Sequence, residues 1–485
     1  MAGSHSFFTI TQITMSLTNK RIASIDIIRG ITIAGMVLCA NIGYNSGLPA
    51  WMFHAQTPPP TYAFNPDVPG ITWVDLVFPF FIFAMGAAFP FAMRKRLEKG
   101  ESWLSMCGSL VKRWLTLTIF ALILGNAYAG AGVDFPAWQV QMFKIALWVA
   151  LFLSLVRVNV PKAAEGLKKH IGTAVNVAGI AMLAVLTVIY TRYFGLSLSR
   201  WSSDIIIMIL AVIALWGGIL WMLTKDNLRL RWLVILLIAA FKALDSYAPA
   251  ALEFVPSFGG ISWFFTWDWL QYLLIALPGS IVGDLILNHS RSGEPLKVDT
   301  KGVVAGALAF IAALVQLWGL FSRNVLADFC ISAVLAASFV ALTWKQRNVY
   351  TNISWIGFAL MLLGIALDPV DGGITKDYCN LSYLFTTCGM TALVTAVLLM
   401  LEMRFGMKCR FVAGVGQNPM LAYTVTSFLI GPILSMLGIL PALYALAAGS
   451  QFWGVMQGVM QGVIITFLMM AVTYAFTKMK LFWRS

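Results

Sequence analysis

The chain has 485 residues, of which 60% are hydrophobic and only 11% are charged, with a formal net charge of +13. Soluble domains average roughly 25% charged residues, so this composition excludes a water-soluble core. Apolar runs of about 17–25 residues recur from end to end, which is the length an α-helix needs to cross a hydrocarbon layer of about 30 Å. The sequence therefore predicts an all-α polytopic membrane protein with one membrane domain, residues 21–485, after a disordered leader, residues 1–20.

The predicted membrane segments follow one another along the whole chain. In order they are 26–45, 72–93, 113–130, 138–157, 171–191, 204–223, 231–249, 268–287, 302–321, 326–344, 352–368, 381–401, 418–437 and 454–477. This gives about fourteen transmembrane helices. Twelve are the alternative, because the pairs 204–223 with 231–249 and 302–321 with 326–344 have short connections.

The positive charge is distributed as a topology signal and not as a nucleic-acid-binding surface. With the N-terminus inside, the cytoplasmic loops and termini hold most of the 33 Lys and Arg residues. The opposite face holds only Arg192, Arg200, Arg323 and Lys376. This bias follows the positive-inside rule and persists through every loop, so both termini are predicted to be cytoplasmic.

The six cysteines are scattered, with no C-x-x-C pair and no histidine at metal-ligand spacing. We expect neither a disulfide framework nor a metal site. The chain also has no P-loop, no Rossmann glycine pattern and no Ser-His-Asp order.

Of the four histidines, only His54 falls in a predicted outer-face loop, between the first two membrane segments. Asn41 lies near the end of the first segment and Asp75 near the start of the second. A neutral imidazole can accept a proton from a hydroxyl or amine, or carry an acyl group, and a carboxylate can fix its tautomer. A purely structural loop histidine is the alternative interpretation.

Three predicted outer loops, residues 46–71, 250–267 and 369–380, carry polar and aromatic residues. Trp51, Asp268 and Lys376 belong to or border these loops. Trp at a membrane boundary is usually an interfacial anchor, and a sugar-stacking platform is the more specific alternative. Ionisable residues within membrane segments are costly and usually functional. Two possible ion pairs have residues three positions apart, Asp26 with Arg29 and Lys242 with Asp245. Lys144 and Asp284 also lie within predicted segments.

Several motifs together resemble a known family. They are Ser24-Ile-Asp26-Ile-Ile-Arg29-Gly30, Asn41-Ile-Gly43, His54-Ala55, Gly70-Ile-Thr-Trp-Val-Asp75 running to Gly86 and, less specifically, Gln271 to Gly279, Lys376 with Leu381-Ser-Tyr383, and Gly416-Gln-Asn418 through Tyr423. The pattern is similar to that of the heparan-α-glucosaminide N-acetyltransferase family and its bacterial relatives. Residues 21–93 carry the specific part of the match.

The resemblance implies an acetyl-CoA-dependent N- or O-acetyltransferase in a bacterial inner membrane, which moves an acetyl group from cytoplasmic acetyl-CoA to an amino sugar or glycan on the periplasmic side. Asn41 and His54 match the family's active-site residues, and Asp75 would orient His54. The residues expected to bind the donor are Arg29, Lys112, Arg113 and Asn418, and those expected to bind the acceptor are Trp51, Asp268 and Lys376. The expected partners are acyl-CoA, the acceptor and the lipid bilayer, with a homodimer as an option.

The chain also departs from the family pattern. Its His54 loop is longer and rich in proline, the chain has about four more helices than the family's core, and Tyr378 and Cys379 stand near the place of a family tryptophan. The acceptor is therefore left open. Two other functions are compatible with the sequence: a transporter or flippase without covalent chemistry, and a scaffold that has lost catalysis.

Overall fold

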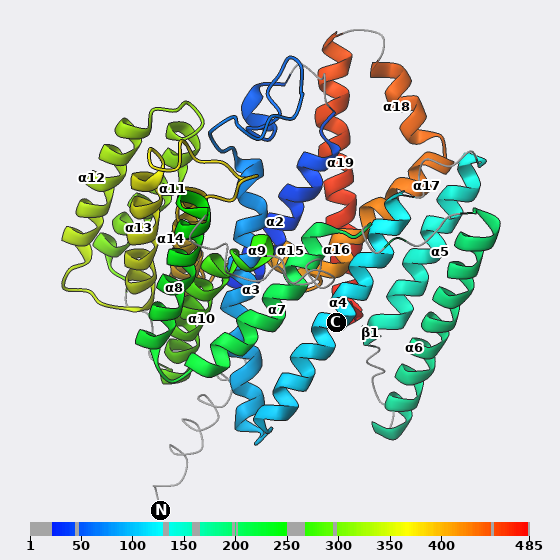
Figure 1. Cartoon of the computed structure of the whole chain (residues 1–485), viewed down its shortest axis with the longest axis horizontal. Helices are drawn as coiled ribbons and strands as arrows, with labels where there is room; N and C mark the ends of the chain where they lie inside the picture. The colour runs from blue at the N-terminus through cyan, green and yellow to red at the C-terminus, as the bar shows by residue number, and fades with distance from the viewer. Residues whose placement is uncertain are drawn as a thin grey trace, which may run out of the picture.

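The computed structural model describes residues 22–43, 48–129, 135–157, 165–195, 199, 202–249, 267–293, 298–447 and 451–483. These residues form a bundle of long helices, with one short two-stranded pairing (Figure 1). The predicted leader and the loop residues Glu253 and Trp263 lie outside the described part of the chain.

All fourteen predicted segments are helical. The long helices are α2 (Ala23–Asn41), α3 (Trp73–Glu98), α4 (Trp103–Ala129), α5 (Ala137–Leu155), α6 (Glu165–Val188), α7 (Ile205–Thr224), α8 (Leu228–Tyr247), α10 (Leu273–Ser292), α11 (Thr300–Gly319), α12 (Val325–Thr343), α13 (Val349–Leu367), α14 (Leu381–Phe405) and α19 (Gln451–Lys478). The remaining segment is built from α16 (Pro419–Val425), a π-helical turn (Thr426–Ile430) and α17 (Gly431–Met436).

The shorter elements are α9 (Trp267–Leu270), α15 (Arg410–Gly416), α18 (Ile439–Ala447), a 3₁₀ turn (Ala50–Met52) and a π-helical turn after α6 (Ile189–Tyr193). Strands β1 (Val156–Arg157) and β2 (Phe482–Trp483) pair antiparallel. The sequence did not predict α18 or the strand pair.

Thirteen helices in the described residues are long and apolar enough to cross a membrane, so the chain is a multi-pass membrane protein. Helix α8 is the predicted segment that fails this test, although it has 20 residues. It carries Arg229, Arg231, Lys242 and Asp245, and such charges are costly in hydrocarbon. These four charges explain why thirteen helices, and not the fourteen predicted segments, meet the test of length and composition.

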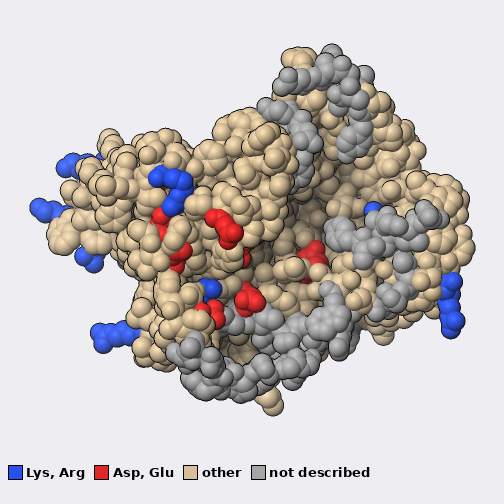
Figure 2. All heavy atoms as spheres, turned by 45° about the horizontal axis from the view of Figure 1, so that its top comes forward, with Lys and Arg blue, Asp and Glu red and all other residues tan. Residues whose placement is uncertain are grey.

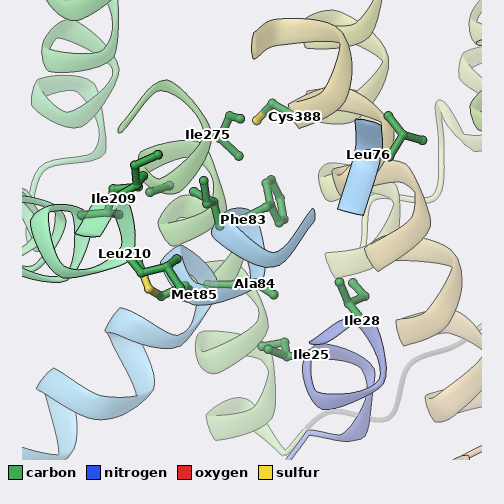
Figure 3. Packing of buried hydrophobic residues seen from close by; sticks show 14 of the residues in the cluster. Ile25, Ile28, Leu76, Phe83, Ala84, Met85, Ile209, Leu210, Ile275 and Cys388 are labelled. Atoms are coloured by element: carbon green, nitrogen blue, oxygen red, sulfur yellow. The ribbon is translucent and has the colours of Figure 1, made fainter. Parts of the chain in front are cut away.

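The centre of the bundle is formed by α14, α10 and α3. In their most apolar stretches the buried share is 83%, 78% and 67%, whereas it is only 11% in α6 and 22% in α12, which lie at the periphery. Figure 3 shows buried side chains from α2, α3, α7, α10 and α14 packed together at this centre. Helix α3 is therefore held on several sides, which fixes both of its ends.

Helices α3 and α10 approach closely at Pro278 and Gly279, two residues that often interrupt helices. Helix α10 continues through both residues, and a side chain on Gly279 would lie 2.4 Å from the Phe83 carbonyl oxygen of α3. The glycine thus permits backbone contact between the two helices, so this motif serves packing. The glycine- and proline-containing stretch 414–419, by contrast, does divide a helix, because α15 ends at Gly416 and α16 begins at Pro419.

The predicted intrahelical ion pairs are present. Arg29 and Asp26 approach to 3.8 Å, and Lys242 and Asp245 to 3.7 Å. Asp284 pairs with Arg231 of α8 at 2.7 Å and also lies 3.5 Å from Arg94. Asp284 of α10 thus links α8 and α3, whereas the two pairs three residues apart each lie within one helix.

Candidate functional site

His54 and Asp75 form a direct pair at the N-terminal end of α3. His54 Nδ1 lies 2.6 Å from Asp75 Oδ1, and the side chains are 32% and 0% exposed. An ionised carboxylate can only accept hydrogen bonds, so Nδ1 carries the proton and donates it to Asp75. The lone pair of the imidazole is then on Nε2, the nitrogen that remains available for chemistry.

Asp75 is fixed by the capping of its own helix. Thr72 is the N-cap of α3, and Asp75, three residues later, completes a capping box in which its Oδ2 accepts from the Thr72 backbone N–H at 2.9 Å. The backbone N–H of Ala55 also donates to Oδ2, at 3.3 Å. One carboxylate therefore joins the helix start to the His54 loop, with Oδ1 left for the imidazole.

Two further hydrogen bonds secure this junction. Thr72 Oγ1 donates to the Phe53 carbonyl at 2.7 Å, which ties the loop just before His54 to the N-cap. Tyr383 of α14, which is buried, donates from its hydroxyl to the Asp75 carbonyl at 2.7 Å. The His54–Asp75 geometry is thus set by three parts of the chain.

Lys376 is the third member of the site. Its Nζ lies 3.3 Å from His54 Nδ1 and 3.9 Å from Asp75 Oδ1, and its side chain is 28% exposed. Since both Lys376 and His54 Nδ1 are donors, they do not bond to each other: Asp75 Oδ1 accepts from His54 and forms an ion pair with Lys376. The ammonium group compensates the charge of a fully buried carboxylate, which would otherwise be costly.

The loop between α13 and α14, residues 368–380, holds Lys376 in place through several tethers. Asp368 is 3% exposed and accepts from both terminal nitrogens of Arg323, at 2.8 and 2.9 Å, and from the Ile374 N–H at 2.7 Å. The Ile374 carbonyl in turn accepts from the Gly70 N–H at 2.7 Å, just before α3. We name Arg323 and Asp368 the loop clamp.

The surface side of this loop is tethered as well. The Tyr378 hydroxyl donates to Asp67 at 2.6 Å, and this bond raises the pKa of Tyr378 above its usual value. Asp371 accepts from the Ser382 N–H at 2.6 Å and from Tyr247. The neighbouring Cys379 is not an alternative nucleophile, because burial raises the pKa of its thiol to about 12.

Asn41, Trp51 and Asp268 form no hydrogen bond with His54 or Asp75 in the described part of the chain. The Asn41 amide donates to the Val37 carbonyl of its own helix at 2.7 Å, and no bond between Asn41 and His54 occurs in the described residues. Trp51 is 52% exposed on the 3₁₀ turn, and Asp268 is exposed on α9. Of the predicted acceptor residues, only Lys376 contacts His54.

The face of the molecule at this end has acidic side chains near its middle, whereas most visible Lys and Arg side chains lie towards its edges (Figure 2). The remainder of this view is largely uncharged. This surface is compatible with a ligand that carries positive charge or hydroxyl groups.

The opposite end of α3 borders a cavity of about 790 Å³, which we name the basic cavity. Ligand sites typically have volumes of about 300–1,000 Å³. The lining residues come from α3, α4, β1, β2 and the α15–α16 break: Ala92, Met93, Lys95, Arg96, Glu101, Ser109, Leu110, Lys112, Arg113, Arg157, Gln417, Pro419, Met420 and Trp483.

Charge makes the basic cavity suited to anions. Its cations outnumber its single acidic residue, Glu101, which is already paired with Arg96 at 2.6 Å. Hydrogen bonds from Arg96 lower the pKa of Glu101, so Glu101 stays ionised and compensates only this one cation. The remaining cations leave a net positive site of the kind that binds phosphate groups.

The predicted donor residues divide into two groups. Lys112 and Arg113 line the basic cavity. Arg29 lies elsewhere, where its guanidinium donates to the Ala84 carbonyl at 2.9 Å and ties α2 to α3. Asn418 lies beside the cavity, but its amide is bonded to the C-terminal segment.

A separate small apolar cavity of about 20 Å³, with room for about one water molecule, shares the wall residues Pro419 and Met420 with the basic cavity. Its other walls include Met36 of α2 and Phe81 of α3. Phe81 is six residues from Asp75, which is roughly 9 Å along a helix. The small cavity thus lies between the two ends of α3.

Sequence reasoning missed part of the basic cavity. Arg96 and Arg157 were not singled out among the cytoplasmic Lys and Arg residues, and Trp483 had no signal at all, since its neighbours are distant in sequence. Tyr383 belonged to a recognised motif but had no assigned role. Its contact with Asp75 spans 308 residues and could not follow from spacing.

No curated protein matches this chain. A family model does match, over residues 21–286, which is more than half of the chain and includes His54, Asp75, Lys112 and Arg113 but not Lys376 or Trp483. The chain belongs to the family of the domain of unknown function DUF5009.

Proposed function

We propose that the protein is a transmembrane acyltransferase, which binds acetyl-CoA in the basic cavity and passes its acetyl group to an amino sugar or glycan at His54. The observation that carries the proposal is the placement of two complementary sites at the two ends of one helix. The His54–Asp75 pair lies at the start of α3, and Lys95 and Arg96 of the basic cavity lie near its end.

The His54–Asp75–Lys376 arrangement supports proton transfer or acyl transfer at Nε2. Asp75 fixes the tautomer and stabilises the positive charge that develops on the ring, and Lys376 balances Asp75 while the ring is neutral. In direct transfer, Nε2 takes the proton of the acceptor amine or hydroxyl as the acceptor attacks the thioester carbon. The C–S bond breaks, and the CoA thiolate leaves and takes up the proton.

An acyl-histidine route uses the same groups. Nε2 attacks the thioester carbon and releases the CoA thiolate, and the acceptor then attacks the acyl-imidazole. The acceptor's proton passes to the leaving imidazole nitrogen. The exposed fraction of His54, 32%, is compatible with approach of an acceptor in either route.

The distance between the sites is compatible with transfer across a bilayer. Residues 75 and 95 are twenty positions apart on α3, which is about 30 Å along a helix and matches the hydrocarbon thickness. The apolar side chains of Met36 and Phe81 lie between them, around a cavity of only about 20 Å³, so passage of the CoA arm requires these side chains to move apart. The resemblance of residues 21–93 to transmembrane acetyltransferases points to the same donor and the same direction.

Purified wild-type and His54→Ala proteins should be incubated with radiolabelled acetyl-CoA and glucosamine. We expect labelled sugar from the wild type and a loss of at least about 100-fold in the variant, because His54 supplies the base or the acyl carrier. His289→Ala, a substitution in the last turn of α10, is the matched control and should leave transfer unchanged. Undiminished transfer by His54→Ala would refute the proposal.

A further inference from the structure

The C-terminal strand β2 is locked beside the basic cavity by Asn418. The Asn418 side chain donates from Nδ2 to the Leu481 carbonyl at 2.9 Å and accepts from the Trp483 N–H at 3.0 Å. Asn418 itself is fully buried. One amide thus satisfies both a donor and an acceptor of the strand, which fixes its position at the α15–α16 break.

Strand β2 also pairs with β1, and the pairing places a cation on the cavity wall. Val156 is opposite Trp483, and Arg157 is opposite Phe482. Arg157 and Trp483 both line the basic cavity. The strand pair is therefore a wall that joins two segments more than 300 residues apart in sequence.

Trp483 is anchored in an aromatic cluster. Its ring centroid lies 5.4 Å from Phe120, 5.8 Å from Phe152 and 6.2 Å from Trp148, in edge-to-face arrangements that stabilise aromatic pairs. Only 3% of the residue is exposed, so it offers a ligand an edge and not a stacking face.

Two donors at this wall have no acceptor in the described residues. They are Trp483 Nε1 and Arg113 Nε, both buried, on two side chains that line the same cavity. Buried donors nearly always have a hydrogen-bond acceptor in folded proteins. Two donors without one, beside a positively charged cavity, indicate a ligand that carries acceptor atoms. By contrast, Trp148 in the same aromatic cluster donates from Nε1 to Thr424 at 3.1 Å.

We propose that β2 is part of the donor-binding site, in which Trp483 and Arg157 contact a phosphorylated nucleotide whose oxygens complete the unpaired donors. This inference rests on the proposed donor site and adds Trp483, which neither the motifs nor the charge pattern indicated, and a specific role for Arg157. It also gives Asn418 a different role: it positions the strand and does not contact the donor.

Binding of CoA to the full-length protein in detergent, measured by isothermal titration calorimetry, tests the inference without requiring turnover. Trp483→Phe keeps an aromatic ring and removes the N–H, and we expect Kd to rise about tenfold, the usual effect of losing one hydrogen bond to a charged group. Trp148→Phe is the matched control, because it alters the same cluster but removes an N–H that is already paired; its Kd should stay within about twofold of the wild type.

Two further variants test the strand as a unit. Arg157→Gln should raise Kd for CoA less at high salt than at low salt, since screening already weakens the lost attraction. Asn418→Ala should raise Kd for CoA at least as much as Trp483→Phe does, because it releases the strand. Trypsin cleavage after Lys478 or Lys480, followed by mass spectrometry, should be faster in Asn418→Ala than in the wild type if β2 has been released.

The outcomes separate this inference from the proposed function. Equal Kd values for wild type and Trp483→Phe overturn the role of β2, whatever the fate of His54. Weaker binding by Trp483→Phe supports it, even if His54→Ala still transfers acetyl groups and the proposed chemistry fails. A wild-type protein that does not bind CoA overturns both.

Discussion

Asp75 combines a structural and a chemical contribution in one carboxyl group. Oδ2 closes the capping box of α3 and receives the Ala55 N–H, and Oδ1 receives His54. The capping box was readable from the sequence as Thr72 followed three residues later by an acidic residue. The partnership with His54 was predicted from their proximity in the chain. Lys376 was predicted from the resemblance alone, as an acceptor residue, because 322 residues separate it from His54.

We predict that Asp75→Asn lowers kcat for acetyl transfer by about 10²–10⁴-fold, because the amide stabilises a charged imidazole poorly and favours the wrong tautomer. KM for acetyl-CoA should stay within about twofold, since the donor binds at the other end of α3. Steady-state kinetics on purified protein measure both. Asp226→Asn, an exposed substitution far from the pair, is the control. Wild-type kcat in Asp75→Asn would mean that the pair is only structural.

Among the helices, α3 connects the two sites, and the loop clamp connects the start of α3 to the ends of α11 and α13. Arg323 follows α11 and Asp368 follows α13, and their pair holds the 368–380 loop against Gly70. The helices themselves were predictable to within a few residues at most ends, because length and apolarity decide where a segment can cross a bilayer. The loops were not, since their hydrogen bonds join residues far apart in the chain.

Asp368→Ala should lower the free energy of unfolding by about 1–3 kcal/mol, because it leaves Arg323 and the Ile374 N–H without their acceptor. Denaturant unfolding in detergent measures the change. The exposed pair of Arg291 with Glu98 provides the comparison, and Glu98→Gln should change stability by less than about 1 kcal/mol. Equal effects of the two substitutions would show that the clamp contributes no more than a surface ion pair.

Across the whole molecule, the number of membrane helices could be predicted closely from composition. Which helices lie at the centre of the bundle and which at its periphery could not. Helix α8 has the length of a span, and its charged residues Arg231 and Lys242 are buried in the protein and paired with Asp284 and Asp245. Arg29 and Asn418 matched family motifs, yet their polar atoms bind other parts of this chain. The sequence motifs thus did not predict what Arg29 and Asn418 contact, because these contacts join residues far apart in the chain.

We propose that an acetyl group crosses the bilayer through this protein, from the basic cavity to His54. The direct measurement uses proteoliposomes with glucosamine trapped inside and radiolabelled acetyl-CoA added outside, with the protein in the orientation that exposes the basic cavity. We predict labelled glucosamine inside vesicles that contain the wild type, and only background label with His54→Ala. Labelled sugar that forms only when both substrates are on the same side, or equally with both proteins, would contradict the claim.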